Sequence, residues 1–136
     1  EYYSPYRSVN CRFLYCALAG IPFTVFRGHH RTSTFIDDTV NTCANITEGF
    51  KAGEVYNICG SRLHSIEESA DLVIKVTGAS PSLVNYLESE ALTTAIKKVD
   101  IAKAVKDLGH TNSVALEEGL RITADWMRKV YNSGNS

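Results

Sequence analysis

The sequence predicts a small α/β domain of four to five helices and three to four short strands. Three observations support this. Stretches with apolar residues at helical spacing alternate with short runs of β-branched and aromatic residues. Glycines stand where most of these stretches end. The 136 residues, 44% of them apolar, suit one packed domain without a linker or repeat, so we expect a single domain over residues 1–136.

The amino-terminal part predicts a helix followed by a strand. Apolar residues recur at helical spacing over 9–19, with Ser8 as a suitable N-cap and Gly20 as the stop. Residues 23–26 are β-branched or aromatic, which predicts a strand. Residues 31–36 are expected to be extended.

A second helix is expected to begin at the acidic pair Asp37-Asp38 and to run to about Glu48, with Gly49 near its end. Two adjacent carboxylates could also serve acid/base chemistry. Their position at a helix start favours capping and a favourable interaction with the helix dipole.

Residues 54–59 predict the clearest strand of the chain. Ser65 and Glu68 then form a capping-box pattern, in which each side chain satisfies a backbone N–H of the other residue. The helix that they open should end at Gly78.

The last third predicts a possible edge strand over 83–87, a short helix over 101–108 and a long helix over 116–131. Trp126 and Met127 lie in an apolar helical pattern and are expected in the core rather than in a site.

Charge and composition exclude several classes of function. The 14 basic and 15 acidic residues nearly balance, which argues against a nucleic-acid-binding protein. No apolar run is long enough to span a bilayer and no signal sequence stands at the start, so we expect a soluble protein with no membrane partner.

The cysteines form no C-x-x-C pair, so reduced, core-lining thiols in a cytoplasmic setting are favoured over disulfides or a zinc site. They are Cys11, Cys16, Cys43 and Cys59.

Two patterns of cofactor-dependent enzymes are absent from the sequence. No set of glycines gives the dinucleotide fingerprint, and there is no P-loop. No Tyr is followed four residues later by Lys, the pair in which an ammonium lowers the pKa of a catalytic phenol. We therefore expect no catalytic residues and no bound cofactor in this chain, and no activity from it alone.

Four ordered stretches resemble one family. Residues 20–26 resemble "G-x-P-x-x-V-Y", residues 31–38 resemble "R-D-F-I-x-V-x-D", and residues 53–58 resemble "G-x-x-Y-N-I". Residues 98–120 resemble "R-x-x-D-x-x-K-A-x-x-x-L-G" followed by "L-E-E-G-L". Together they resemble the carboxy-terminal, substrate-binding part of the extended short-chain dehydrogenase/reductases, the NAD-dependent nucleotide-sugar epimerases and dehydratases. The chain departs from these patterns at Ser33, Cys59 and Lys98.

The resemblance implies a role for each matching position. In that family the amino-terminal half binds NAD and carries the Tyr and Lys, whereas the carboxy-terminal half binds the nucleoside diphosphate of the substrate. By position, Arg31 would contact the pyrophosphate, and the family's second phosphate-binding Arg falls at or beside Lys98. Phe26 and Thr24 would lie near the base.

Each of these sites has a simpler interpretation. Arg31 could be a solvated turn residue, and Lys97-Lys98 an exposed basic pair. His29-His30 suggests metal chelation, but adjacent side chains of an extended segment point to opposite faces and no third ligand is evident. A plain loop is favoured there, and we expect no metal site.

The sequence thus indicates the nucleotide-sugar-binding portion of an epimerase or dehydratase that lacks the NAD-binding domain. Two alternatives remain open. The chain could be a stand-alone interaction or oligomerisation module, and a homo-oligomer is expected because a removed partner domain exposes apolar surface. It could also be one half of a split enzyme, completed by a separate NAD-binding domain.

Overall fold

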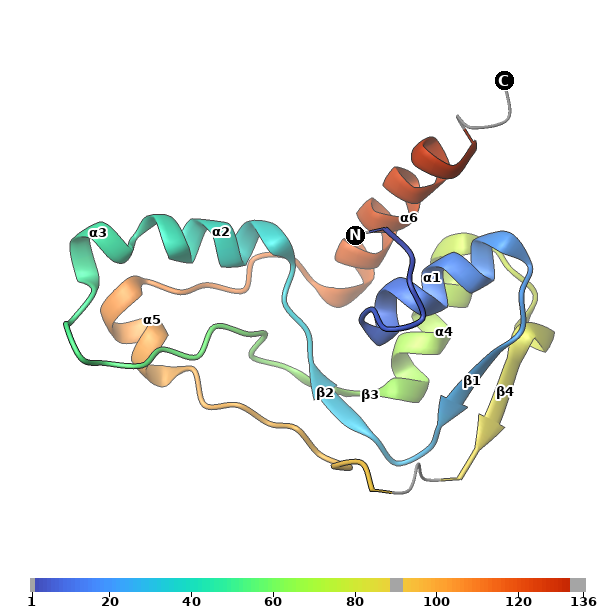
Figure 1. Cartoon of the computed structure of the whole chain (residues 1–136), viewed down its shortest axis with the longest axis horizontal. Helices are drawn as coiled ribbons and strands as arrows, with labels where there is room; N and C mark the ends of the chain where they lie inside the picture. Colours follow the sequence, from blue (N-terminus) through green and yellow to red (C-terminus); the bar gives the residue numbers. More distant parts are fainter. Residues whose placement is uncertain (1, 89–91, 133–136) are drawn as a thin grey trace.

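The computed structural model describes residues 2–88 and 92–132 (Figure 1). It is an α/β fold, as predicted. In chain order the elements are α1 (Val9–Ala19), β1 (Phe23–Phe26), β2 (His30–Thr32), α2 (Ile36–Ala44), α3 (Ile46–Gly49), β3 (Leu63–Ser65), α4 (Ile66–Thr77), the 3-10 turn η1 (Pro81–Leu83), β4 (Val84–Leu87), α5 (Ala102–Leu108) and α6 (Leu116–Asn132).

The hydrophobic core lies where α1, α4 and α6 pack together against β1, on the right of Figure 1. Leu14, Val25, Val73 and Met127 are fully buried there. Met127 is in the core as predicted, and Trp126 packs partly buried against it. Helices α2, α3 and α5 form a separate group on the left of the same view.

The predicted helix caps are largely confirmed. Ser8 Oγ accepts from the N–H of Cys11, and Gly20 ends α1 in the left-handed conformation at φ 68°. Ser65 Oγ accepts from the N–H of Glu68 at 2.9 Å and so begins α4. The Glu68 carboxylate itself forms an ion pair with Arg62.

Two small sheets carry the strands. The predicted strands over 23–26 and 83–87 are confirmed as β1 and β4, which pair in parallel. β2 pairs antiparallel with β3, with Arg31 opposite His64, and a parallel bridge joins His30 to Ile96. β3 was not predicted, because three residues directly before a helix show no periodicity to detect.

The predicted strand over 54–59 is wrong for this chain. No strand forms there within the described residues, although the segment is not helical either. Its contacts come from side chains: Tyr56 OH donates to Asp107 Oδ2 and Asn57 Nδ2 donates to the Asp100 carbonyl, each at 3.2 Å.

The predicted capping by the acidic pair is also wrong. Phe35 occupies the N-cap of α2 without a side-chain hydrogen bond, and Asp37 and Asp38 lie in the first turn. Asp38 is 2% exposed, and its carboxylate accepts from the N–H and hydroxyl of Ser113 and from the N–H of Val114. It anchors the loop before α6 instead of capping its own helix.

The helix expected up to Glu48 divides into α2 and α3 at Asn45. For this reason the described residues contain six α-helices instead of four to five. Asn45 Nδ2 donates to the carbonyl of Leu108, and Gly49 passes so close to α5 that an added Cβ would lie 2.0 Å from the Asp107 carbonyl oxygen. These contacts to α5 fix the bend.

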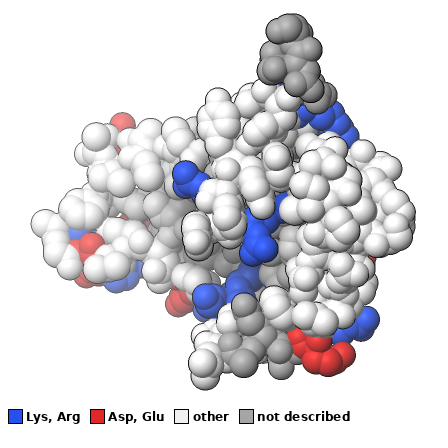
Figure 2. Space-filling model, turned by 45° about the vertical axis from the view of Figure 1, so that its right-hand side comes forward, with Lys and Arg blue, Asp and Glu red and all other residues white. Residues whose placement is uncertain are grey.

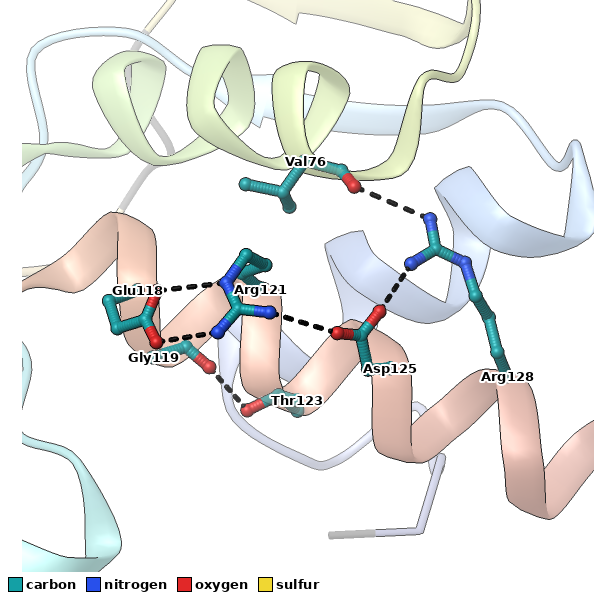
Figure 3. Close-up of polar contacts among 7 residues, drawn as sticks. All are labelled: Val76, Glu118, Gly119, Arg121, Thr123, Asp125 and Arg128. Carbon is teal, nitrogen blue, oxygen red and sulfur yellow. Dashed lines mark hydrogen bonds and ion pairs between the residues drawn. The ribbon is translucent and has the colours of Figure 1, made fainter.

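Helix α6 is joined to the end of α4 by Arg128 (Figure 3). Its guanidinium donates to the backbone carbonyls of Val76 and Thr77, the last two residues of α4. It also forms an ion pair with Asp125 of α6. Arg121 bridges Glu118 and Asp125 along the exposed face of α6. A cation at a helix C-terminus satisfies free carbonyls and complements the dipole.

The prediction that all the cysteines line the core is wrong for Cys43, which is exposed on α2. Cys11 and Cys16 are buried and Cys59 is half-buried; all are free thiols. Burial raises the pKa of the Cys16 thiol. No helix among the described residues is long and apolar enough to cross a membrane.

Candidate functional site

Strand β1 presents Thr24 and Phe26 on its outer face. Side chains alternate along a strand, and here Phe23 and Val25 are buried in the core whereas Thr24 and Phe26 are half-buried on the other side. The two residues predicted to lie near a base therefore share one face.

The Arg31 guanidinium is held by backbone carbonyls. Its Nη1 donates to the carbonyl of His30 at 2.7 Å and to that of Ala95 at 2.9 Å, and Nη2 lies 3.5 Å from His29 Nδ1. The residue is half-buried within β2. Arg31 is thus a fixed cation rather than the freely solvated turn residue of the simpler interpretation.

Lys98 belongs to the segment that lies beside β2. The N–H of His30 donates to Ala95 and the N–H of Lys97 donates to His30, so the two segments run in parallel from the bridge. Lys97 and Lys98 follow this bridge on one segment as Arg31 follows it on the other, and both lysines are exposed. Figure 2 shows several Lys and Arg side chains gathered in the middle of one face of the molecule.

The loop predicted at His29 and His30 is confirmed up to His29 and is wrong for His30, which begins β2. His29 is 3% exposed and His30 lies in β2. The N–H of Gly28 donates to Glu67 Oε1 at 2.9 Å. Burial alone would raise the pKa of Glu67, but this N–H and the nearby His30 and Arg27 lower it. A carboxylate from α4 thus fixes the turn that leads into Arg31.

A polar cluster that was not predicted lies next to Arg31. Ser33 Oγ lies 3.1 Å from His64 Nε2, and Asn10 Nδ2 donates to Ser33 Oγ at 3.2 Å. Burial lowers the pKa of His64 and so favours the neutral ring. Only the register of β2 with β3 brings His64 here, and the sequence did not indicate that pairing.

Two cavities adjoin Ser33. The larger, of about 240 Å³, lies between the amino-terminal ends of α1 and α6, and the smaller, of about 130 Å³, reaches His64. Ser33 lines both cavities. Neither cavity is lined by Arg31, Lys98, Phe26 or Thr24.

The described part of the chain contains no group of three or more His, Cys, Asp or Glu side chains that could hold a metal ion. Arg31 is a fixed cation, Lys97 and Lys98 are exposed on the neighbouring segment, and Phe26 lies on the outer face of β1. Such a surface can hold an anion joined to a planar group.

No family model matches the chain. The known proteins that it resembles are enzymes named for nucleotide sugars. A dTDP-glucose 4,6-dehydratase of Streptomyces griseus is 31% identical over 94 residues, which is 69% of this chain and 29% of that enzyme. A UDP-N-acetyl-α-D-glucosaminuronate decarboxylase of Bacillus cytotoxicus is 25% identical over 135 residues, covering 94% of this chain and 42% of that enzyme.

Among solved structures, the UDP-glucose 4-epimerase of Thermotoga maritima with UDP-glucose superposes with a TM-score of 0.83. It is 28% identical, over 94% of this chain and 42% of that enzyme. The chain is related to the NAD-dependent nucleotide-sugar epimerases and dehydratases. Its fold is that of their carboxy-terminal part, as the resemblance implied. It spans less than half the length of each of these relatives.

Proposed function

We propose that this chain is the nucleotide-sugar-binding portion of an NAD-dependent epimerase or dehydratase and is catalytically incomplete by itself. The observation that supports this most directly is Arg31. Its guanidinium is oriented by two backbone carbonyls beside the segment that carries Lys97 and Lys98.

A diphosphate carries two or more negative charges close together, and it is recognised by cations placed at fixed positions. A pre-oriented guanidinium loses little side-chain entropy on binding and can grip two oxygens at once. Lys98 supplies a mobile point charge from the neighbouring segment. In this proposal Arg31 contacts the pyrophosphate and Lys98 completes its neutralisation.

The base would lie against Phe26, with Thr24 on the same outer face of β1. An aromatic ring stacks on a planar base through dispersion and quadrupole interactions. The Thermotoga maritima epimerase was crystallised with UDP-glucose, which makes uridine diphosphate sugars the first ligands to test.

Titration calorimetry with UDP, UDP-glucose and dTDP tests the proposal. We expect binding by at least one of them, and Arg31→Ala should weaken it about 10- to 100-fold, since a charge-assisted hydrogen bond contributes roughly 1.5–3 kcal/mol. Arg31→Lys should recover only part of the loss. Lys106→Ala, which removes an exposed charge on α5, is the matched control and should leave affinity unchanged.

The folded protein binding no nucleoside diphosphate would refute this function. Equal weakening by the Arg31 and Lys106 substitutions would refute the assigned site. Rising salt should weaken binding of the wild-type protein more than that of Arg31→Ala, because fewer ionic contacts remain in the variant.

Activity would require an NAD-binding domain, either from the same polypeptide or as the other half of a split enzyme. A homo-oligomer is a second proposal, which the exposed Ile36 and Val40 on α2 favour. The free thiols are compatible with a cytoplasmic setting, which stays a proposal.

A further inference from the structure

Ser33 and His64 form the pair of side chains that a hydroxyl nucleophile requires. Ser33 Oγ lies 3.1 Å from His64 Nε2, within the distance at which a base can take a hydroxyl proton. Asn10 Nδ2 donates to the same oxygen at 3.2 Å, so Ser33 Oγ accepts one hydrogen bond and its own proton can be donated elsewhere. In the tautomer with the proton on Nδ1, His64 Nε2 is the acceptor for it.

His64 is suited to act as the base. The residue is 4% exposed, and burial lowers the pKa of its ring, while a hydrogen bond to the Arg62 backbone and the Glu68 carboxylate oppose this shift. The side chains of Arg62 and His30 act in the same direction as burial. The neutral ring, which is the form that can accept a proton, is therefore favoured near neutral pH.

The two cavities at Ser33 give an ester room on both sides of the nucleophile. The larger, of about 240 Å³, is lined in part by Leu14, Leu116 and Leu120. It is smaller than the cavities of about 300–1,000 Å³ that hold drug-sized ligands, so it suits a short acyl group. The smaller, of about 130 Å³, is lined by His64. A leaving alcohol placed there would lie next to the group that must protonate it.

Developing negative charge is favoured at the same place. Both α1 and α6 begin at the larger cavity. The N–H groups of a first helical turn have no intrahelical acceptor, and the positive end of the helix dipole attracts an oxyanion. The Asn10 amide, which already donates to Ser33 Oγ, is a further donor beside the carbon that this oxygen would attack.

We propose that Ser33 is a catalytic nucleophile for short acyl esters, with His64 as its general base and Asn10 as an oxyanion donor. Ser33 Oγ attacks the ester carbonyl carbon while its proton passes to His64 Nε2. The bond from that carbon to the alcohol oxygen then breaks, and the alcohol oxygen takes the proton from His64. Water repeats both transfers on the acyl-Ser33 ester, which releases the carboxylic acid and restores the pair. This hydrolysis is separate from the sugar chemistry, for which the chain stays incomplete.

Covalent labelling with an alkyl fluorophosphonate tests the nucleophile. Attack of Ser33 Oγ on phosphorus expels fluoride, so the intact mass should rise by one phosphonyl group, and peptide mapping should place that group on Ser33. Ser33→Ala should abolish labelling. His64→Gln keeps a polar side chain but no base, and should slow labelling by at least about 100-fold. Ser82→Ala is the matched control, because Ser82 is exposed and its hydroxyl lies 2.8 Å from that of Ser80 rather than beside a histidine. It should be labelled like the wild-type protein.

Hydrolysis of p-nitrophenyl esters tests turnover. The kcat/KM of the wild-type protein for the butyrate ester should exceed that of Ser33→Ala by at least about 100-fold. The decanoate ester should react more slowly than the butyrate ester, because the larger cavity holds only a short chain. The wild-type rate should be constant above about pH 6.5 and fall only below it, because burial lowers the pKa of His64 from the ordinary histidine value.

Ser33→Cys separates activation by His64 from mere packing. At pH 6 an ordinary thiol, with a pKa of about 8.5, is almost entirely protonated, whereas a thiol that passes its proton to a histidine reacts as the thiolate. The exposed Cys43 is an internal reference in the same molecule. Iodoacetamide should alkylate the introduced thiol at least about tenfold faster than Cys43.

Labelling that is absent, spread over several residues or unchanged in Ser33→Ala would overturn the proposal. Labelling of Ser33 at the wild-type rate in His64→Gln, or an introduced thiol no more reactive than Cys43, would refute the role of His64 and with it the catalytic pair. Urea unfolding of each variant distinguishes a lost nucleophile from a lost fold. The introduced thiol answers the same question even where His64→Gln does not fold.

Discussion

Replacing Asp38 by Asn should destabilise the fold far more than the same change at its neighbour Asp37. Asp38 is buried and its carboxylate accepts from the N–H of Ser113 at 3.1 Å, from the Ser113 hydroxyl, and from the N–H of Val114 at 3.3 Å. An amide keeps one acceptor oxygen and turns an NH₂ toward a donor. One buried donor is then unpaired, at about 1–3 kcal/mol, and the remaining bonds lose their charge, so we expect about 3 kcal/mol in total.

Asp37 provides the matched control, because it lies in the same first turn of α2 and is exposed. Both substitutions remove one negative charge from the helix N-terminus, a loss of about 0.3–1 kcal/mol. Urea unfolding measures both free energies. A difference below about 0.5 kcal/mol between the two variants would refute the anchoring role of Asp38, given the uncertainty of extrapolation.

The effect of Asp38 should depend on pH in one direction. The Ser113 hydroxyl, together with the N–H groups of Ser113 and Val114, lowers the pKa of Asp38 against the opposing effect of burial. A carboxyl whose pKa is lower in the folded state stabilises the fold fully above its unfolded pKa of about 3.9, and this contribution is lost as the pH falls through the folded value. The gap between the wild-type protein and Asp38→Asn should be constant near neutral pH and shrink below about pH 4.

Two further substitutions test contacts that hold the elements together. Gly60→Ala should destabilise the fold by at least about 3 kcal/mol in urea unfolding, because the new Cβ would lie 1.9 Å from the Ser33 carbonyl oxygen, where backbone must move; a loss below about 1 kcal/mol would contradict this packing. Arg128→Met should lower the unfolding free energy by about 1–2 kcal/mol through loss of the bonds to Val76 and Thr77, and a smaller effect is expected from Arg121→Met, whose contacts lie within α6.

Helices whose ends carry their own local signals could be predicted from the sequence. Ser8 with Gly20 bounds α1, and Ser65 with Gly78 bounds α4, each by hydrogen bonds within a few residues. The break at Asn45 could not be predicted in this way. It depends on a bond to Leu108 and on the close approach of Gly49 to Asp107, both more than fifty residues away along the chain.

Some features of the candidate site could be predicted from the sequence, whereas others depend on contacts between distant segments. Thr24 and Phe26 share a face because strands alternate, which the sequence alone specifies. Arg31 was identified through its motif, but its orientation comes from the carbonyl of Ala95 on a distant segment. Ser33, His64 and Asn10 meet only because β2, β3 and α1 converge, so no local pattern could reveal that cluster.

The wrong strand prediction over residues 54–59 has a different origin. Alternation and β-branched content report whether a segment suits a pleated sheet, but pairing requires a second strand within reach. Here the intrinsic preference is present, the segment lies extended on its side-chain contacts, and no strand of the described chain lies against it. The prediction therefore failed on pairing, which the residue pattern of a single segment does not report.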